Sequence, residues 1–348
     1  MNKFYTYVDE HRLGALCRAV GAGPVLIVTH DNPDPDALAS GKALAAFFHL
    51  AWNVPSRLVY SGVVARAENL AMLKKLTPEW EPHETLPDLS AFSAVAMVDT
   101  QPGAGNNRLP ETSVPLLVFD HHNPLREATH SAAYADVRTG IGSTVTLIYQ
   151  YLQAVHITPE PPLATAMFYG LSADTLGLSR NVSEADKAVY IELIPLIDRD
   201  ELISVEQARR QREYFRSLYT SLQAARVNQR SIVAWIGDLH RPDMTADVAD
   251  LLIRLSGMQA ALCVGKFQDV LHVALRTEPF GPDAGALIQQ AVHSLGRAGG
   301  HGTIAGGQIY LEGREAVTLA QEVIRRFWDS IGESGEGEAL LREGMDGQ

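Results

Sequence analysis

Short apolar runs alternate with longer helical patterns through the first half of the chain. Apolar, β-branched runs are typical of buried parallel strands, and they predict strands at residues 24–29, 56–60, 94–98 and 114–119. Segments rich in Ala and Leu lie between and after these runs, and they predict helices at residues 37–49, 68–76, 143–154, 163–171 and 184–197. This alternation predicts an α/β fold with a doubly wound, mostly parallel sheet.

The second half of the chain follows a different pattern. It contains predicted strands at residues 232–236, 260–267, 271–276 and 307–311, and predicted helices at residues 247–255, 284–295 and 315–331. This mixture predicts a smaller mixed-sheet α/β domain. We therefore expect four parts: an N-terminal domain at residues 1–197, a polar helical linker at 198–228, a second domain at 229–331 and a disordered tail at 332–348.

Acidic and imidazole side chains follow the predicted strands of the first half. The motif Asp120-His121-His122 directly follows the fourth run, and Asp99 directly follows the third. The loop from His30 to Asp36 follows the first run, and we expect a similar strand exit at Asp174. Because ligands sit at the carboxyl ends of strands in such sheets, we expect these side chains to meet at one edge.

Each acidic motif also has an ordinary structural interpretation. Asp34 and Asp36 are typical helix caps in a turn that also contains Asn and Pro, and Asp99 or Asp174 alone could cap a helix or close a turn. The combination favours metal binding. Four crowded carboxylates would raise one another's pKa values, whereas two divalent cations would cancel their charge and let a phosphate enter.

The ligand types indicate which cations to expect. Oxygen-rich ligation with imidazole suits Mn²⁺ best, with Mg²⁺ as the alternative. Two such ions side by side suit the hydrolysis of phosphate esters. The sequence therefore predicts two divalent cations at the edge of the first domain.

Composition and charge narrow the class of substrate. The chain has 348 residues, which is enough for two domains with sizeable cores, and its formal net charge is −12. That charge argues against a long nucleic-acid duplex but allows a short anionic ligand in a local pocket. We find no apolar run of signal-peptide or membrane-spanning length, and the two cysteines, Cys17 and Cys263, lie far apart. We expect a reduced, cytoplasmic protein with no membrane partner.

The four motifs together resemble the DHH phosphoesterase superfamily, which includes the RecJ nucleases, the family II pyrophosphatases and the nanoRNase/pAp phosphatases. Size and domain order are most similar to the last group. The second domain resembles the DHH-associated domain through the segments Leu271–Arg276 and Gly296–Gly302. Two departures leave the substrate preference open: Ala298 stands where the family often has a further glycine, and Thr277 stands where it has serine.

The resemblance implies that six side chains hold the two cations: His30, Asp34, Asp36, Asp99, His121 and Asp174. In this pattern His30 and Asp34 hold the first cation, and Asp99 bridges both. The second cation is held by the remaining three side chains.

The resemblance also implies roles around the cations. Asp120 would orient His121 from behind, and His122 would contact the scissile phosphate. Asp99 and His122 are thus the expected catalytic residues. In the second domain, the expected substrate-binding residues are Arg276, Gly299, Gly300 and His301.

The implied activity is a manganese-dependent phosphoesterase or oligoribonuclease. Its substrates would be RNAs of two to five nucleotides, 3′-phosphoadenosine 5′-phosphate, or both, attacked by a hydroxide that bridges the metals. A phosphodiesterase for cyclic or linear dinucleotides is the alternative, and a catalytically silent nucleotide sensor is a third interpretation. The sequence leaves open the substrate, the metal, the direction of exonucleolytic attack and the pairing of two chains into a homodimer.

Overall fold

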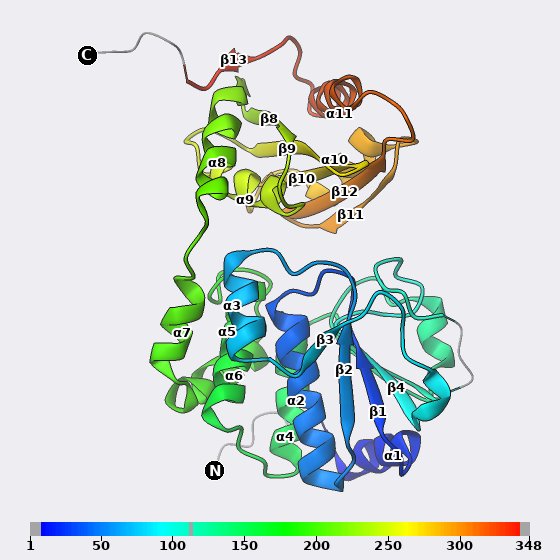
Figure 1. Ribbon diagram of the computed structural model, residues 1–348. Coiled ribbons are helices and arrows are strands. Elements are labelled where there is room, and N and C mark those ends of the chain that lie inside the picture. Colours follow the sequence, from blue (N-terminus) through cyan, green and yellow to red (C-terminus); the bar gives the residue numbers. More distant parts are fainter. Residues whose placement is uncertain (1–7, 111–113, 342–348) are drawn as a thin grey trace. The chain divides into compact units, whose positions relative to one another are not determined.

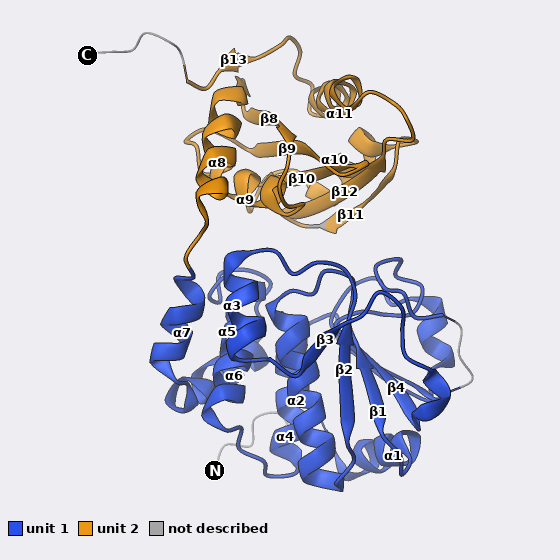
Figure 2. Ribbon diagram, viewed as in Figure 1, with its two compact units in different colours: residues 1–208 blue, residues 209–348 orange. Residues whose placement is uncertain are grey.

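The computed structural model describes residues 8–110 and 114–341, and the chain divides into two compact units (Figure 2). Unit 1 spans residues 1–208 and unit 2 spans residues 209–348. The division falls inside the predicted linker, between helix α7 (Arg199–Glu206) of unit 1 and helix α8 (Arg212–Ala224) of unit 2. The predicted linker therefore contains two separate helices and, at residues 226–228, a short strand.

Unit 1 contains a six-stranded sheet in the order β3-β2-β1-β4-β5-β6, and every strand pair is parallel (Figure 1). Its strands are β1 (Val25–Val28), β2 (Ser56–Tyr60), β3 (Trp80–Pro82), β4 (Ala94–Val98), β5 (Leu116–Asp120) and β6 (Tyr134–Val137). This confirms the predicted fold class. The two edge strands, β3 and β6, are short and partly exposed, so they lack the apolar run that predicts the others.

The helices of unit 1 are α1 (Glu10–Val20), α2 (Pro35–Trp52), α3 (Ala67–Lys75), α4 (Thr144–Ala154), α5 (Pro161–Thr175), α6 (Glu184–Leu193) and α7. Short 3₁₀ turns occur at Leu89–Ala91, Glu127–Ser131 and Ile194–Leu196. Among the described residues, no helix is both long and apolar enough to cross a bilayer.

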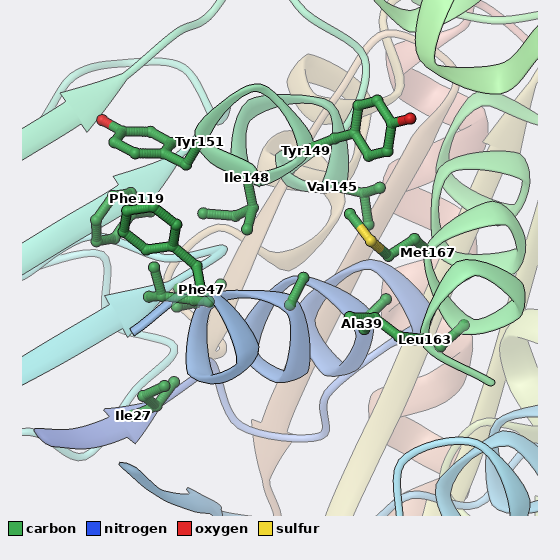
Figure 3. Close-up of a cluster of buried hydrophobic side chains, with 14 of the residues drawn as sticks. Ile27, Ala39, Phe47, Phe119, Val145, Ile148, Tyr149, Tyr151, Leu163 and Met167 are labelled. Atoms are coloured by element: carbon green, nitrogen blue, oxygen red, sulfur yellow. The ribbon is translucent and has the colours of Figure 1, made fainter. Parts of the chain in front are cut away.

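Helices α2, α4 and α5 share one buried core with the sheet (Figure 3). Phe47 of α2 packs edge-on against Tyr151 of α4 at 5.6 Å between ring centroids, and Phe119 of β5 contacts the same tyrosine. Helix α5 approaches the start of α2 closely at Gly170, where a Cβ atom would lie only 2.9 Å from the Pro35 carbonyl oxygen. This packing fixes the loop after β1 against α4 and α5.

Unit 2 contains a seven-stranded mixed sheet in the order β11-β12-β10-β9-β8-β7-β13. Only the β8–β9 pair is parallel. The strands are β7 (Arg226–Asn228), β8 (Ser231–Asp238), β9 (Ala260–Phe267), β10 (Val270–Thr277), β11 (Arg297–His301), β12 (Ile304–Tyr310) and β13 (Glu338–Ala339). The helices are α8, α9 (Met244–Leu252), α10 (Ala284–Val292) and α11 (Ala316–Ser330). The predicted mixed α/β domain is confirmed.

Two segments of unit 2 form structure that the sequence does not predict. Part of the predicted disordered tail is ordered, because β13 pairs with β7 and Glu333 is 6% exposed, accepting hydrogen bonds from Arg230 N and Ser231 Oγ. Residues 342–348 lie outside the described residues. The glycine-rich segment Gly296–Gly302 is mostly strand β11, which pairs with β12 and whose glycines give no alternation of apolar and polar side chains.

Candidate metal centre

The loop between β1 and α2 brings His30, Asp34 and Asp36 to the carboxyl edge of the sheet. Asp34 is the N-cap of α2, and its Oδ1 accepts a hydrogen bond from Ala37 N at 3.0 Å. Its other oxygen, Oδ2, lies 3.9 Å from His30 Nε2. Asp34 is thus both the helix cap of the ordinary interpretation and a member of the cluster.

Asp99 occupies the centre of the cluster, directly after β4. Its backbone adopts a left-handed conformation with φ 61°, which is uncommon outside glycine and concentrates at functional sites. Its Oδ2 lies 3.5 Å from His30 Nε2, and its Oδ1 lies 3.5 Å from His121 Nε2. The buried Asp99 carboxylate therefore lies between two imidazoles, as the predicted bridging role requires.

The two imidazoles are oriented in the same way. In His30 and His121 the Nδ1 atoms donate to the backbone carbonyls of Asp31, at 3.0 Å, and Ile141, at 3.2 Å. The Nε2 of each ring faces carboxylates, and the buried Nε2 of His121 makes no hydrogen bond. A histidine that ligates a metal typically donates its other ring N–H to a backbone carbonyl or carboxylate. The rings are thus oriented as metal ligands would be.

Asp36 is held by the N-terminus of α4. Its carboxylate is 1% exposed and accepts from Ser143 Oγ at 2.6 Å and from the N–H groups of Thr144 and Val145 at 2.7 and 2.9 Å. Thr144 Oγ1 also donates to Asp99 Oδ1 at 2.8 Å. Ser143 and Thr144 carry no signal of this role in the sequence, since a Ser-Thr pair before an apolar helix indicates only an N-cap.

Asp174 lies on the last turn of α5, so the expectation of a strand exit at this position is wrong. Its Oδ2 nevertheless lies 3.2 Å from His121 Nε2. Arg180, in the loop that follows, is 20% exposed and donates to the Asp174 carbonyl at 2.8 Å. Helix packing, rather than a strand, brings this carboxylate to the sheet edge.

Asp120 contacts a different histidine from the one expected. Its Oδ1 accepts from His122 Nδ1 at 2.8 Å, whereas His121 donates to the Ile141 carbonyl. The expectation that Asp120 orients His121 is therefore wrong. Asp120 is the last residue of β5, and residues two apart in an extended chain point to the same side, so Asp120 meets His122.

Three groups of potential ligand atoms result, each with its atoms within 4.8 Å of one another. The groups are His30–Asp34–Asp99, Asp36–His121–Asp174 and Asp99–His121–His122. The first two match the predicted pair of sites, and the third connects them through Asp99 and His121. Together with the buried His121 Nε2 that makes no hydrogen bond, this donor set fits two adjacent divalent cations.

The charges of the cluster shift its pKa values. Burial, together with the charge of Asp99, raises the pKa values of Asp34 and Asp36. Burial alone would lower the pKa of His30, but its contacts with Asp99 and Asp34 raise that pKa to about 10. Burial would raise the pKa of Asp99, but the neighbouring imidazoles of His30 and His122 lower it. The cluster thus stabilises positive charge, which protons or divalent cations can supply.

One protein-family model matches most of unit 1. The model of the DHH family, N-terminal domain, matches residues 24–171, which include all six strands of unit 1 and every predicted metal ligand except Asp174. Unit 1 therefore contains a DHH family N-terminal domain. The matched region ends at residue 171, inside α5. Asp174 therefore lies three residues beyond the end of the match.

Known proteins resemble this DHH chain along most of its length. The uncharacterized protein MJ1633 of Methanocaldococcus jannaschii is 32% identical in an alignment of 311 residues that covers 87% of this chain. The chain spans 63% of the length of that relative.

Two solved structures share the fold. An exopolyphosphatase-related protein from Bacteroides fragilis has a TM-score of 0.72 at 14% identity, covering 96% of this chain and 100% of its own. RecJ from Thermus thermophilus in complex with Mn²⁺ has a TM-score of 0.56 at 16% identity, covering 94% of this chain and 55% of its own. At these identities the likeness shows the fold alone.

The predicted substrate-binding residues of this DHH chain lie in unit 2. Arg276 is 8% exposed, and its Nε donates to Asp250 Oδ1 at 2.5 Å, so the guanidinium is already paired. At Gly299 a Cβ atom would meet no atom within 4 Å, whereas at Gly300, with φ 150°, it would lie 2.4 Å from Ala305 Cα. His301 pairs with Ile304 through the backbone. Of the two glycines, Gly299 offers an open backbone.

Proposed function

We propose that this DHH chain is a phosphoesterase that uses two divalent cations. The observation that carries the proposal is the pair of ligand groups, His30–Asp34–Asp99 and Asp36–His121–Asp174, which meet where Asp99 lies 3.5 Å from both His30 and His121. The donors are carboxylates and imidazoles, which suit Mn²⁺ and, as the alternative, Mg²⁺.

The bound cations would supply Lewis acidity and would lower the pKa of water near the phosphate. The chain itself positions the reacting groups. Asp99 orients both ligand groups, and His122, whose side chain is 43% exposed, faces the substrate. Its contacts with Asp120 and Asp99 outweigh burial and raise the pKa of His122 to about 9. A protonated His122 can therefore neutralise charge that develops on a phosphoryl oxygen.

We propose short nucleotides as substrates: RNAs of two to five nucleotides, 3′-phosphoadenosine 5′-phosphate, or both. The net charge of −12 supports a short substrate over a long duplex. Within unit 2, we keep Gly299, Gly300, His301 and Arg276 as proposed substrate contacts, and Arg276 would have to exchange Asp250 for a phosphate. Cyclic or linear dinucleotides are the second candidate class, because the same machinery cleaves them.

A metal analysis combined with a substrate panel tests the proposal. We expect two equivalents of bound Mn²⁺ and hydrolysis of at least one member of a panel with 3′-phosphoadenosine 5′-phosphate, linear and cyclic dinucleotides, short RNAs and a long RNA. Faster turnover of short than of long RNA would support the substrate class. Two bound metals without hydrolysis of any member of the panel would instead indicate a nucleotide sensor. Absence of both metal binding and hydrolysis would refute the whole proposal.

A further inference from the structure

Gln101 is a buried amide just after β4, and it contacts the oxygen of Asp120 that His122 Nδ1 does not. Gln101 is 2% exposed. Its Nε2 donates to Asp120 Oδ2 at 2.7 Å and to the His122 carbonyl at 3.1 Å. Its Oε1 accepts from Arg126 N at 2.7 Å and from Thr129 Oγ1 at 3.2 Å. The amide thus connects Asp120 to the chain that follows β5.

These contacts allow only one orientation of the amide. The His122 carbonyl can only accept a hydrogen bond and the Arg126 N–H can only donate one, so the NH₂ end of Gln101 must face His122 O and Asp120 Oδ2. The carbonyl end then meets two donors, the Arg126 N–H and the Thr129 hydroxyl. Both ends of the amide are satisfied, and a rotation would leave buried polar groups without partners. Gln101 is therefore a rigid support for Asp120.

The contact between Gln101 and Asp120 determines which carboxylate accepts the hydrogen bond from His122. The Nδ1 atom of His122 lies 2.8 Å from Asp120 Oδ1 and 3.7 Å from Asp99 Oδ1, so two carboxylates compete for one ring nitrogen. Gln101 holds the second oxygen of Asp120, which fixes the plane of the carboxylate facing His122. Without that bond, the Asp120 carboxylate could turn, and His122 could move towards the central Asp99.

We propose that Gln101 is a positioning residue for His122. It acts through Asp120, keeping Nδ1 of His122 away from Asp99 and leaving Nε2 to donate to a phosphoryl oxygen of the substrate. This inference rests on the proposed phosphoesterase function, since a role in turnover presupposes that His122 contacts the phosphate. The sequence carries no signal for it, because a single glutamine after a strand has many ordinary uses.

A double-mutant cycle tests the role in turnover. The full-length Mn²⁺ enzyme is assayed with bis(p-nitrophenyl) phosphate as wild type, Gln101→Met, His122→Ala and the double variant. Methionine is close to glutamine in size but cannot donate to Asp120. We expect Gln101→Met to lower kcat about tenfold to a hundredfold with KM and bound metal unchanged. In the His122→Ala background it should have no further effect, whereas a multiplicative loss would overturn the inference.

Asn107→Leu is the matched control. Asn107 lies in the same loop, and its Nδ2 donates to Thr100 Oγ1 at 3.2 Å and to the Gln101 carbonyl at 3.0 Å. The variant therefore removes two hydrogen bonds of this loop without touching Asp120. We expect wild-type kcat. A loss equal to that of Gln101→Met would show that general loosening of the loop, not positioning, causes the effect.

A second measurement needs no turnover. NMR spectra are recorded on Mg²⁺-loaded protein labelled with ¹⁵N-histidine. The proton on His122 Nδ1, which is hydrogen-bonded to Asp120, should give a low-field resonance that is assigned by its loss in His122→Ala. We expect Asn107→Leu to retain it and Gln101→Met to shift it upfield or lose it. An unchanged resonance in Gln101→Met overturns the inference. If the wild type hydrolyses no phosphate ester, the proposed function fails, but this resonance still decides whether Gln101 fixes the ring.

Discussion

At the scale of single residues, Asp99 is the side chain on which the site depends most. It is 1% exposed and is the only carboxylate shared by two of the three ligand groups of the described residues. We expect Asp99→Asn to lower turnover by at least about a hundredfold, because an amide cannot supply the negative charge that bridges the two cations. This loss is larger than that expected for a residue that only hydrogen-bonds a metal ligand. Metal analysis should show loss of both cations, while circular dichroism shows an intact fold.

A neighbouring carboxylate provides the control. Asp31 lies in the same loop as His30 but belongs to none of the three ligand groups, and its Oδ1 is 3.5 Å from Arg108 Nε. Asp31→Asn should keep both metals and most of the turnover. Near-normal turnover with two bound metals in Asp99→Asn would contradict the bridging assignment.

His30 couples the stability of the metal-free protein to pH. Its pKa is about 10 in the folded protein, against an ordinary value of 6.5. A base whose pKa rises on folding contributes stability that is complete below pH 6.5 and is lost as the pH rises through about 10. We expect the free energy of unfolding of chelator-treated protein to fall by a few kcal/mol, in order of magnitude, over that range. In urea titrations at each pH, His30→Gln should show a smaller fall, and equal slopes would contradict this linkage.

The ligand types could be predicted from sequence, but several of their partners could not. Asp99 and His121 follow strands, so their position at the sheet edge depends only on the topology of the sheet. The pairing of Asp120 with His122 depends on side-chain direction at one residue. The contacts of Thr144 with Asp99 and of Gln101 with Asp120 depend on how segments distant in the sequence pack together. A local sequence pattern does not predict that packing.

At the scale of elements, α6 controls where α4 begins. Asp186 of α6 is fully buried and accepts from Gly142 N at 2.8 Å, Thr146 Oγ1 at 2.6 Å and Ser183 Oγ at 2.6 Å. It thereby fixes the turn that presents the α4 N-terminus to Asp36. The sequence predicts only a helix at residues 184–197, whereas the hydrogen bonds that Asp186 accepts from Gly142 and Thr146 depend on the tertiary fold.

This contact gives a prediction for α6. Asp186→Ala leaves several buried donors without an acceptor, so we expect the free energy of unfolding to fall by about 3 kcal/mol. Metal affinity should fall as well, because Asp36 loses its fixed partner. Denaturant unfolding and a metal titration measure the two effects. Glu184→Ala, in the exposed first turn of the same helix, should change neither. Equal effects of the two variants would contradict the role of Asp186.

The sequence predicts the buried parallel strands but not the edge strands of unit 2. Apolar runs predicted β1, β2, β4 and β5 within a few residues, because buried parallel strands are apolar on both faces. Strand β11 pairs through glycines, and β13 is two residues long, so neither has a side-chain pattern. Such edge elements form only because a neighbouring strand offers unpaired backbone groups.

At the scale of the whole molecule, the two units have separate cores. Each of the four hydrophobic clusters of the described residues draws its members from one unit only. All six predicted metal ligands lie in unit 1. Metal binding should therefore stabilise unit 1 directly, and any effect on unit 2 would have to be transmitted between them.

Calorimetry of the full-length protein tests this separation. We expect two unfolding transitions in the metal-free protein, and we expect Mn²⁺ to raise the midpoint of only one. At a free Mn²⁺ concentration a hundredfold above Kd, the stabilisation should be about 2.7 kcal/mol per independent site, because the cation binds the folded unit and not the unfolded chain. In Asp99→Asn the shift should disappear while the second transition stays in place. A single transition that moves as a whole with Mn²⁺ would show that the two units unfold together, and the metal would then stabilise the entire chain.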